Sequence, residues 1–581
     1  MKLTGLLFAA ALLGTCTQPA AEENYTRHVD PKIGTGGHGH VFVGANVPFG
    51  LVQVGPTSIP QTWDWCSGYH ASDSTVIGFS HTHLSGTGIG DLFDVTVMPV
   101  TGEVTYARGE EADPASGLWS YADRTQEIAR PGYYSVPLTR YGIRAELTAT
   151  ARVGLHRYTF PASEKAAVVF DLENGGCWDK ATETHLAKEG DRTVTGWRHS
   201  TGWAKDQRVY FAAEFSKPFE KFETIGDNYA RASFRTTDGE QVSLKVALSP
   251  VSVEGARENL AAELPGWDFE ETAKAADKAW NDELSKVKIE TEDETSKRIF
   301  YTALYHTMVA PSLFCDVNGD YYGSDHAIHR NADFTNYTTF SLWDTYRAAM
   351  PLMTVLHPEK MADIVQTMLT ISDEQGRLPV WHLWGNETDC MVGNPGIPVV
   401  ADAIVKGIGG FDREKAFEAI RKTAMNPDRG NGLRMEYGYI PCEMFNEAVA
   451  YDMEYALADG AARAAEALGR TEDAKYFTER SHSYRNYFDP ATRFMRGRDS
   501  KKGWRTPFNA FASTHRADDY CEGNAWQYTW LAPHDVKGLE GLFGSRAKMI
   551  EKLDSLFTVS SVIEGGETSP DISGLIGQYA H

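Results

Sequence analysis

Cysteine is scarce in this chain, with 7 among 581 residues, and its spacing excludes two classes of small protein site. Past the N-terminal segment the cysteines are Cys66, Cys177, Cys315, Cys390, Cys442 and Cys521. Their wide scatter provides no CxxC pair for a metal and no compact disulfide scaffold. Some of them could pair in an oxidising compartment, but the spacing alone does not choose the partners.

Positive charge is also scarce, since 56 Lys and Arg stand against 79 Asp and Glu, a net charge of −23. Nucleic acid requires a basic footprint and anionic membranes attract basic segments, so neither is expected as a partner. A hydrophobic content of 42% with 14 Trp, 26 Tyr and 27 Phe indicates a folded protein with aromatic surfaces that suit neutral sugars. Acidic soluble proteins of other kinds fit the charge equally well.

Long apolar runs are absent, and the one short run lies at the N-terminus, from Leu6 to Leu13 after a basic start. This pattern predicts an export signal over residues 1–21 and not a transmembrane helix. Leu13-Gly14-Thr15-Cys16 resembles a bacterial lipobox, with an atypical Thr15, and predicts a lipid anchor at Cys16 as the one membrane contact. Simple cleavage near Ala20-Ala21 is the alternative. We expect an exported protein, either periplasmic or an outer-membrane lipoprotein of a Gram-negative bacterium.

The period of the hydrophobic pattern changes along the chain and predicts a multidomain β + α protein. Residues 22–265 contain short, partly alternating segments such as Arg208–Phe215 and Gln241–Leu248, which predict an N-terminal β-sandwich. Residues 266–290 predict a linker helix, and residues 291–581 show helical spacing with long polar loops. No short-period repeat is evident, so a helical toroid is favoured over a solenoid.

Glu522 is the strongest candidate for a catalytic acid. Trp526 and Trp530 follow it at helical spacing, and an acid that lies against indole rings is partly desolvated. Desolvation raises the pKa of a carboxyl group, as a general acid near neutral pH requires. Protonation of a glycosidic oxygen fits this site but normally needs a second carboxylate opposite. No good candidate for that partner lies between Glu522 and His581.

Two further aromatic motifs are candidates for binding. In Ser341–Arg347, Asp344 and Arg347 share a helix face, so Asp344 stays ionised and can accept hydrogen bonds from vicinal hydroxyls. An intrahelical salt bridge explains the same spacing equally well. The polar loop around Trp381 and Glu387 is favoured to line a cleft. The segment Trp63-Asp64-Trp65 could form a sugar platform or fill an edge of the sandwich.

Other chemistries have weaker support. His38-x-His40 and His81-x-His83 could bind zinc, but no further ligands are evident, so this interpretation is disfavoured. Gly34–Gly37 is followed by no Lys-Ser/Thr, which excludes a phosphate loop. No G-x-S-x-G elbow supports a serine nucleophile.

Taken together, six stretches make the chain resemble glycoside hydrolase family 92, the calcium-dependent exo-acting α-mannosidases, from near Asp30 to His581. They are Gly44–Gly50, Phe79–Gly86, Ser341–Arg347, Glu387–Met391, Glu522–Gln527 and Asp571–His581. The resemblance implies an N-terminal β-sandwich, a helical linker and a C-terminal (α/α)6 barrel, in agreement with the change of period.

The resemblance also implies a function: inverting release of terminal mannose, with α-1,2 linkages favoured, from mannose-rich oligosaccharides or glycoproteins. It implies Glu522 as general acid, calcium-assisted ring distortion, and Gln527 as a calcium ligand, because calcium prefers oxygen. Besides Asp344, the residues expected to bind substrate are Trp65, Arg347, Trp381, Glu387, Trp526 and His581.

At its end the sequence departs from the family pattern. Family members continue from a Tyr-Ala-His stretch like Tyr579–His581 into Asn-Glu-Pro and a Gly-Asn-Asp-Asp motif that carries the catalytic base. We therefore expect an incomplete barrel, a base beyond this chain, and little activity from residues 1–581 alone. The alternatives are a mannan-binding remnant without catalysis or a glycoside phosphorylase, which needs only one protein acid.

Overall fold

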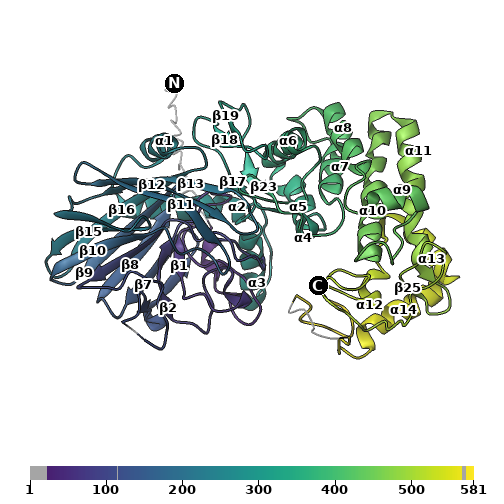
Figure 1. Cartoon of the computed structure of the whole chain (residues 1–581), viewed down its shortest axis with the longest axis horizontal. Helices are drawn as coiled ribbons and strands as arrows, with labels where there is room; N and C mark the ends of the chain where they lie inside the picture. The colour runs from purple at the N-terminus through teal and green to yellow at the C-terminus, as the bar shows by residue number, and fades with distance from the viewer. Residues whose placement is uncertain (1–22, 114, 566–570, 581) are drawn as a thin grey trace, which may run out of the picture.

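The computed structural model describes residues 23–113, 115–565 and 571–580. The predicted export signal, Cys16 and His581 lie outside these residues. The strands gather at one side of the molecule and most helices at the other (Figure 1). The predicted order, a β-sandwich followed by a helical domain, is confirmed.

Two open antiparallel sheets form the sandwich. The six-stranded sheet runs in the order β1 (Gly55–Thr57), β3 (Gly78–Ser80), β4 (Thr96–Thr101), β10 (Ser163–Asp171), β15 (Tyr229–Thr236) and β14 (Lys221–Ile225). The eight-stranded sheet runs in the order β11 (Lys180–Glu189), β12 (Thr193–Thr201), β13 (Gln207–Phe215), β16 (Glu240–Ser249), β9 (Val153–Phe160), β8 (Ile143–Ala149), β7 (Tyr133–Leu138) and β6 (Ile128–Arg130). A short pair, β2 (Thr75–Val76) and β5 (Ser120–Tyr121), lies beside them.

The position of each strand explains its composition. Strand β10 pairs with β4 on one side and β15 on the other, and its segment 166–171 is fully buried, which accounts for the continuous apolar run there. Strand β11 lies at the edge of its sheet and is mostly exposed, which accounts for its charged and polar composition. The sandwich core therefore lies between the central strands of the two sheets.

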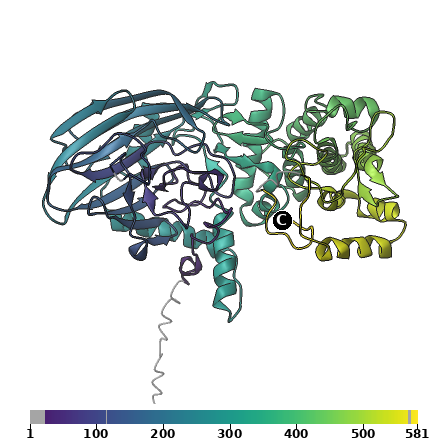
Figure 2. The same cartoon turned by 60° about the horizontal axis from the view of Figure 1, so that its bottom comes forward.

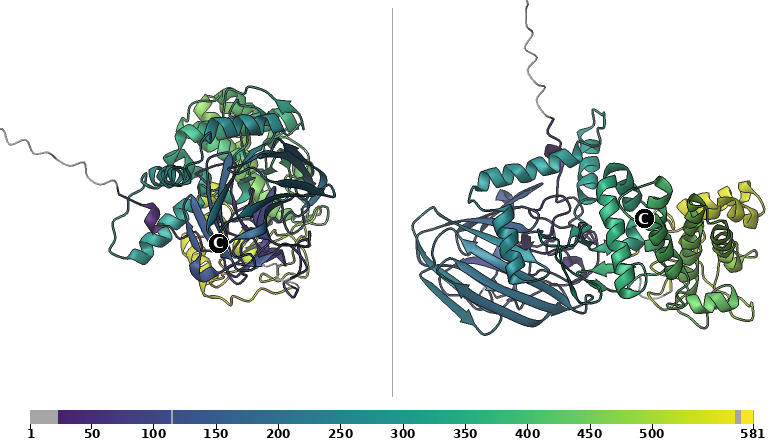
Figure 3. Two further views of the ribbon diagram at one scale, coloured as in Figure 1. Left: turned by 90° about the vertical axis from the view of Figure 1, so that its left-hand side faces the viewer. Right: turned by 90° about the horizontal axis from the view of Figure 1, so that it is seen from above.

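Helices α1 (Val253–Glu263), α2 (Phe269–Leu284) and α3 (Glu294–His306) connect the two parts, and α2 occupies the stretch predicted as a linker helix. The Asp268 carboxylate caps α2 by accepting the N–H of Glu271 at 3.0 Å. Trp280 is fully buried in α2 and donates its indole N–H to the Asn46 carbonyl at 2.7 Å. Helices α1 and α2 thus lie against strands of the sandwich, and α3 packs against α2 (Figure 3).

The helical domain contains α4 (Leu342–Thr345), α5 (Ala349–Leu356), α6 (Pro358–Gln375), α7 (Gly396–Lys406), α8 (Arg413–Ala424), α9 (Asn431–Tyr437), α10 (Ala448–Ala462), α11 (Thr471–Arg480), α12 (Ala525–Tyr528), α13 (Val536–Phe543) and α14 (Arg546–Thr558). Its short strands are β17 (Ser312–Leu313), β18 (Tyr321–Tyr322), β19 (Ile328–His329), β20 (Tyr337–Thr338), β21 (Phe340–Ser341), β22 (Trp381–Leu383), β23 (Asn386–Glu387), β24 (Phe488–Asp489) and β25 (Phe494–Met495).

Helix α10 is buried along most of its length and packs against α7, α8 and α11. Its many alanines allow this close approach. The fully buried Asp452 of α10 pairs with Arg434 at 2.8 Å, which ties α9 to α10. Within the described ranges, every helix is too short or too polar to cross a bilayer. After α14 the chain turns back, so its last described residues lie near the junction with the sandwich (Figure 2).

Candidate active site

A cavity of about 730 Å³ lies at the junction between the sandwich and the helical domain, and both parts contribute to its wall. The sandwich side contributes the aromatic rings of Trp63, Trp178 and Trp203. Aromatic faces of this kind suit the apolar faces of a sugar ring. Only the folded assembly of both parts brings these rings to the same space as the helical-domain carboxylates.

Three carboxylates line the cavity among the described residues: Asp344, Glu522 and Asp571. The pKa of Glu522 rises to about 8, because burial disfavours its charged form and the negative charges of Asp571, Asp344 and Glu447 add to that effect. Arg516 opposes the rise with a smaller effect. Glu522 is therefore largely protonated at neutral pH, which agrees with the expectation of a raised pKa.

The backbone holds Glu522 in an unusual conformation. Its φ is +44°, in the left-handed region that residues other than glycine seldom adopt. Such conformations persist where the surrounding structure enforces them, and they cluster at functional sites. Glu522 also lies before helix α12, which begins at Ala525 with Asn524 as its cap.

Desolvation raises the pKa of Glu522 as expected, but the expected helix face shared with Trp526 is wrong, because α12 begins only at Ala525. Trp526 is buried in another direction, with ring centroids 4.8 Å from Phe494 and 5.7 Å from Phe511. The Lys552 ammonium lies 4.0 Å from the centroid of the Trp526 ring on the same side. Trp526 therefore packs in the domain core, and the cavity wall among the described residues does not include it.

Asp344 lies in α4 on the cavity wall, where the Ser341 hydroxyl donates a hydrogen bond to its carboxylate. Arg347, predicted to hold Asp344, forms an ion pair with Glu454 of α10 at 2.8 Å. Its guanidinium also lies over the Trp343 ring, 5.1 Å from the centroid. Arg347 thus fastens α4 to α10, while Asp344 faces the cavity.

Glu454 is a site residue that the sequence did not reveal. Its buried carboxylate accepts hydrogen bonds from Trp343 Nε1 at 3.0 Å, the Tyr346 hydroxyl at 2.9 Å and Arg347 at 2.8 Å. Burial raises the pKa of Glu454, with Arg347 opposing. Three side chains of the Ser341–Arg347 motif thus converge on one residue more than 100 positions away, so no local spacing could have indicated it.

Trp381 lines the cavity as predicted, at the start of β22. Glu387 of the neighbouring β23 is arranged differently. Its carboxylate accepts the backbone N–H groups of Val380, Trp381 and Asp389 at 2.8–3.0 Å. It is absent from the described cavity wall, so in this arrangement it holds the loop that presents Trp381.

Trp65 was expected to bind the sugar, but the neighbouring Trp63 is the residue that lines the cavity. Trp65 stacks on His70 with centroids 4.5 Å apart and donates its indole N–H to Asp73 at 2.8 Å. Both tryptophans lie in one short 3-10 turn, Trp63–Trp65, so they point in different directions. Trp178 and Trp203 also line the wall, and no motif in the sequence had singled them out.

The two His-x-His pairs do not converge on a zinc site. His38 lies on the cavity wall, 2.8 Å from Asp64, and His40 lies beside it. His81 and His83 are buried in the sandwich, where His81 Nε2 lies 2.9 Å from His156 Nε2.

Gln527, the residue expected to bind calcium, makes hydrogen bonds to the chain around it. Gln527 Oε1 accepts the backbone N–H of Asn524 at 2.6 Å, and its amide donates to the Gln578 carbonyl at 2.8 Å. In the part of the chain that is described, one group of three has ligand atoms close together: Asp325, His329 and Glu374. It contains an imidazole, whereas calcium takes oxygen ligands.

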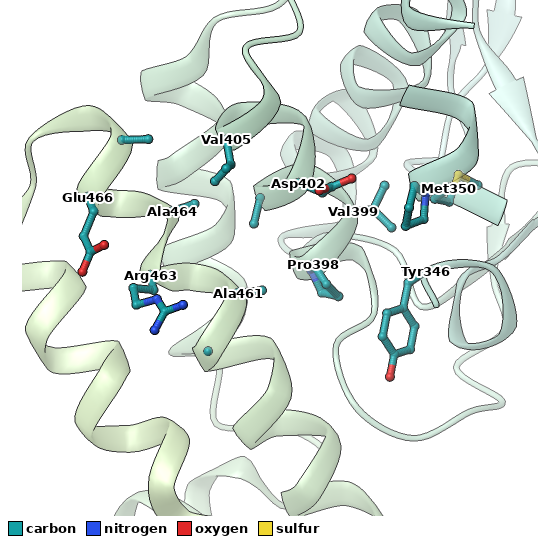
Figure 4. A pocket seen from close by; sticks show the side chains of 14 residues that line it. Tyr346, Met350, Pro398, Val399, Asp402, Val405, Ala461, Arg463, Ala464 and Glu466 are labelled. Carbon is teal, nitrogen blue, oxygen red and sulfur yellow. The ribbon is translucent and has the colours of Figure 1, made fainter. Parts of the chain in front are cut away.

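A second cavity, of about 480 Å³, lies between α5, α7 and the end of α10 (Figure 4). Apolar side chains such as Met350 and Val399 line most of it, with Asp402 and Arg463 at its edges. Asp344, Glu522 and Asp571 do not line this second cavity, so the first cavity is the candidate active site.

Comparisons with known proteins agree with this arrangement. The sequence model of the Glycosyl hydrolase family 92 catalytic domain matches residues 255–581, and that of the family's N-terminal domain matches residues 28–249. A family GH92 alpha-mannosidase from Bacteroides thetaiotaomicron, solved in complex with mannoimidazole, is 39% identical with a TM-score of 0.92. That match covers 96% of this chain and 77% of the other.

Two further relatives extend the comparison. A GH92 inverting mannosidase from the same bacterium is 30% identical with a TM-score of 0.84, over 93% of this chain and 75% of the other. A protein of Arthroderma benhamiae, named an uncharacterized secreted glycosidase, is 26% identical over 94% of this chain and 76% of its own length. With both family models and these relatives in agreement, this chain belongs to glycoside hydrolase family 92 and is a glycoside hydrolase.

Proposed function

We propose that the protein is an exported, exo-acting, inverting α-mannosidase that removes terminal mannose from mannose-rich oligosaccharides or glycoproteins, with α-1,2 linkages favoured. The observation that carries the proposal is the buried Glu522, with its pKa raised to about 8, in a cavity whose wall also holds Asp344 and several tryptophans. The likeness to a mannosidase solved with mannoimidazole supports mannose as the sugar, and the secreted relative supports export.

In this mechanism Glu522 donates its proton to the glycosidic oxygen as the bond from that oxygen to the anomeric carbon breaks. The bonding electrons leave with the oxygen, and water attacks the anomeric carbon from the opposite face. The water loses a proton to a second carboxylate, which in inverting enzymes lies about 6.5–9.5 Å from the acid. The product is β-mannose. Asp344, ionised, accepts hydrogen bonds from vicinal hydroxyls and so orients the ring.

Calcium is the proposed cofactor on the strength of the family membership. Among the described His, Cys, Asp and Glu side chains, the one converging group contains an imidazole, so no step is assigned to the ion. The proposal is limited to a requirement for the ion in turnover, which chelation followed by calcium addition measures directly.

The test is hydrolysis of α-1,2-, α-1,3- and α-1,6-linked mannobioses by the intact protein, with the product anomer followed by NMR, and the variants described below are made in that protein. We expect β-mannose as the first product, fastest release from the α-1,2 substrate, and loss of turnover with a chelator that calcium restores. An initial α-mannose product would contradict inversion. Added inorganic phosphate should leave the product unchanged, and formation of mannose 1-phosphate would instead support a phosphorylase.

A further inference from the structure

Three loops of the sandwich form one side of the cavity wall, and they are packed tightly together. The middle loop contains Gly88 and Gly90. Trp63, from the first loop, donates its indole N–H to the Gly88 carbonyl at 3.0 Å. A Cβ added to Gly88 would lie 2.6 Å from the Trp63 ring, so only glycine permits this contact.

The third loop lies against the other side of the middle loop. Trp178 donates its backbone N–H to the Gly90 carbonyl at 3.3 Å. A Cβ added to Gly90 would lie 2.8 Å from atoms of both Cys177 and Trp178. The glycine loop is therefore held between the loop that carries Trp63 and the loop that carries Trp178, and both rings face the cavity.

The first and third loops also meet directly, through two cysteines. Cys66 ends the 3-10 turn of Trp63, where its N–H donates to the Trp63 carbonyl at 3.1 Å, and its side chain is buried. Cys177 Sγ lies 3.6 Å from the Thr62 carbonyl at the start of that turn. The thiols of Cys66 and Cys177 are within hydrogen-bonding reach of each other, while both cysteines remain reduced in the structure.

We propose that Cys66 and Cys177 form a disulfide bond in an oxidising compartment, and that this bond clasps the glycine loop and fixes the Trp63–Trp178 side of the cavity wall. The bond rests on the export part of the proposed function and not on the mannosidase activity. Only its effect on turnover rests on the cavity being the mannose site.

The oxidant is a disulfide of the compartment, such as a thiol–disulfide oxidoreductase or oxidised glutathione. Cys177 is the partly exposed thiol, and the hydrogen bond from Cys66 lowers the pKa of Cys177, so its thiolate attacks first. A mixed disulfide forms as one oxidant thiolate leaves. The Cys66 thiolate then attacks the Cys177 sulfur, and the second oxidant thiolate leaves. Two protons and two electrons pass from the cysteines to the oxidant.

The first experiment maps the bond without using substrate. The exported full chain is alkylated, digested without reductant and analysed by mass spectrometry. We expect a linked peptide pair containing Cys66 and Cys177, and a gain of two alkylated cysteines when the protein is first reduced. Absence of that pair in the exported protein, or a bond from either cysteine to another residue, would overturn the proposal.

The second experiment measures how the disulfide affects stability and substrate binding. Tm and KM are compared for the wild-type protein before and after mild reduction and for Cys177→Ser. Removing the bond should lower the Tm by about 4–15 °C, because the long chain segment between the cysteines is no longer closed. KM for mannobiose should rise about 3–10-fold with a smaller change in kcat. Cys442→Ser, distant from this wall, is the matched control. If the disulfide is present but its reduction leaves both KM and Tm unchanged, the proposal that it fixes the Trp63–Trp178 side of the wall is refuted.

Discussion

Replacing Glu522 with Gln removes the ionisable proton and keeps the size of the side chain. The variant therefore tests Glu522 as the acid by two measurements, the rate on different leaving groups and the pH dependence of rate and stability. General acid catalysis contributes roughly 10²–10⁴-fold, so kcat on natural mannobioses should fall by that factor. The loss should be smaller on dinitrophenyl mannosides, whose leaving group needs little protonation.

The second measurement is the pH dependence of the rate, because burial raises the pKa of Glu522 to about 8. Only the protonated form donates, so kcat/KM should fall about tenfold per pH unit above pH 8 if Glu522 sets that limb. Stability follows the same ionisation. From the ordinary value of 4.5 up to about 8, the unfolded chain ionises Glu522 and the folded chain does not. Stability is therefore fully present below the lower value and lost progressively as pH rises to the upper one.

The magnitude follows from the size of the shift, which is 8 − 4.5, or about 3.5 pKa units. At about 1.4 kcal/mol per unit the full cost is on the order of 5 kcal/mol, an upper figure for a side chain that keeps some contact with water. Glu522→Gln should abolish this pH dependence of the free energy of unfolding. Compared with the wild type, the variant should therefore be more stable at pH 8 than it is at pH 4. Equal loss of rate on both substrate types, or an unchanged difference in stability across this range, would refute the assignment.

The remaining predictions concern the residues around Glu522. Asp344→Asn should reduce kcat/KM at least 100-fold and shift the alkaline limb to lower pH, since a negative charge that raises the pKa of Glu522 is removed; pH–rate profiles measure both. Trp63→Ala should raise KM several-fold in steady-state assays, whereas its control Trp65→Ala should change Tm with little effect on KM. Glu454→Leu should lower Tm by several degrees and impair turnover, because three donors lose their acceptor, and Glu454→Gln should restore part of both; an unchanged Tm would contradict this.

The sequence predicted features that depend on local pattern. Alternation over segments such as 208–215 and helical spacing after residue 296 reflect which faces are buried, so the change from strands to helices was readable. The Asp412 carboxylate accepts the N–H groups of Glu414 and Lys415 at the start of α8, the local pattern of a helix cap. Capping and periodicity involve residues a few positions apart, which is why they succeeded.

Side-chain direction was predicted less well, because it depends on contacts between distant segments. The spacing of Glu522 and Trp526 indicated a shared helix face, but the helix begins three residues after Glu522. Trp63 and Trp65 are two positions apart, and only the packing against Gly88 and His70 decides which of them faces the cavity. The sequence pattern indicates that aromatic side chains are present in this segment, whereas the tertiary structure determines which of them faces the cavity.

Under the proposed function, the Ser341–Arg347 motif serves binding through Asp344 and support through its contacts with Glu454 of α10. Trp343, Tyr346 and Arg347 donate to Glu454, so these three residues fasten α4 and the turn after it to α10. Asp344 is thereby left on the cavity wall, where its negative charge helps to raise the pKa of Glu522. A carboxylate for binding and a carboxylic acid for proton transfer can coexist in one cavity only if their pKa values are pushed apart. Burial of Glu522, together with the charge of Asp344, has that effect here.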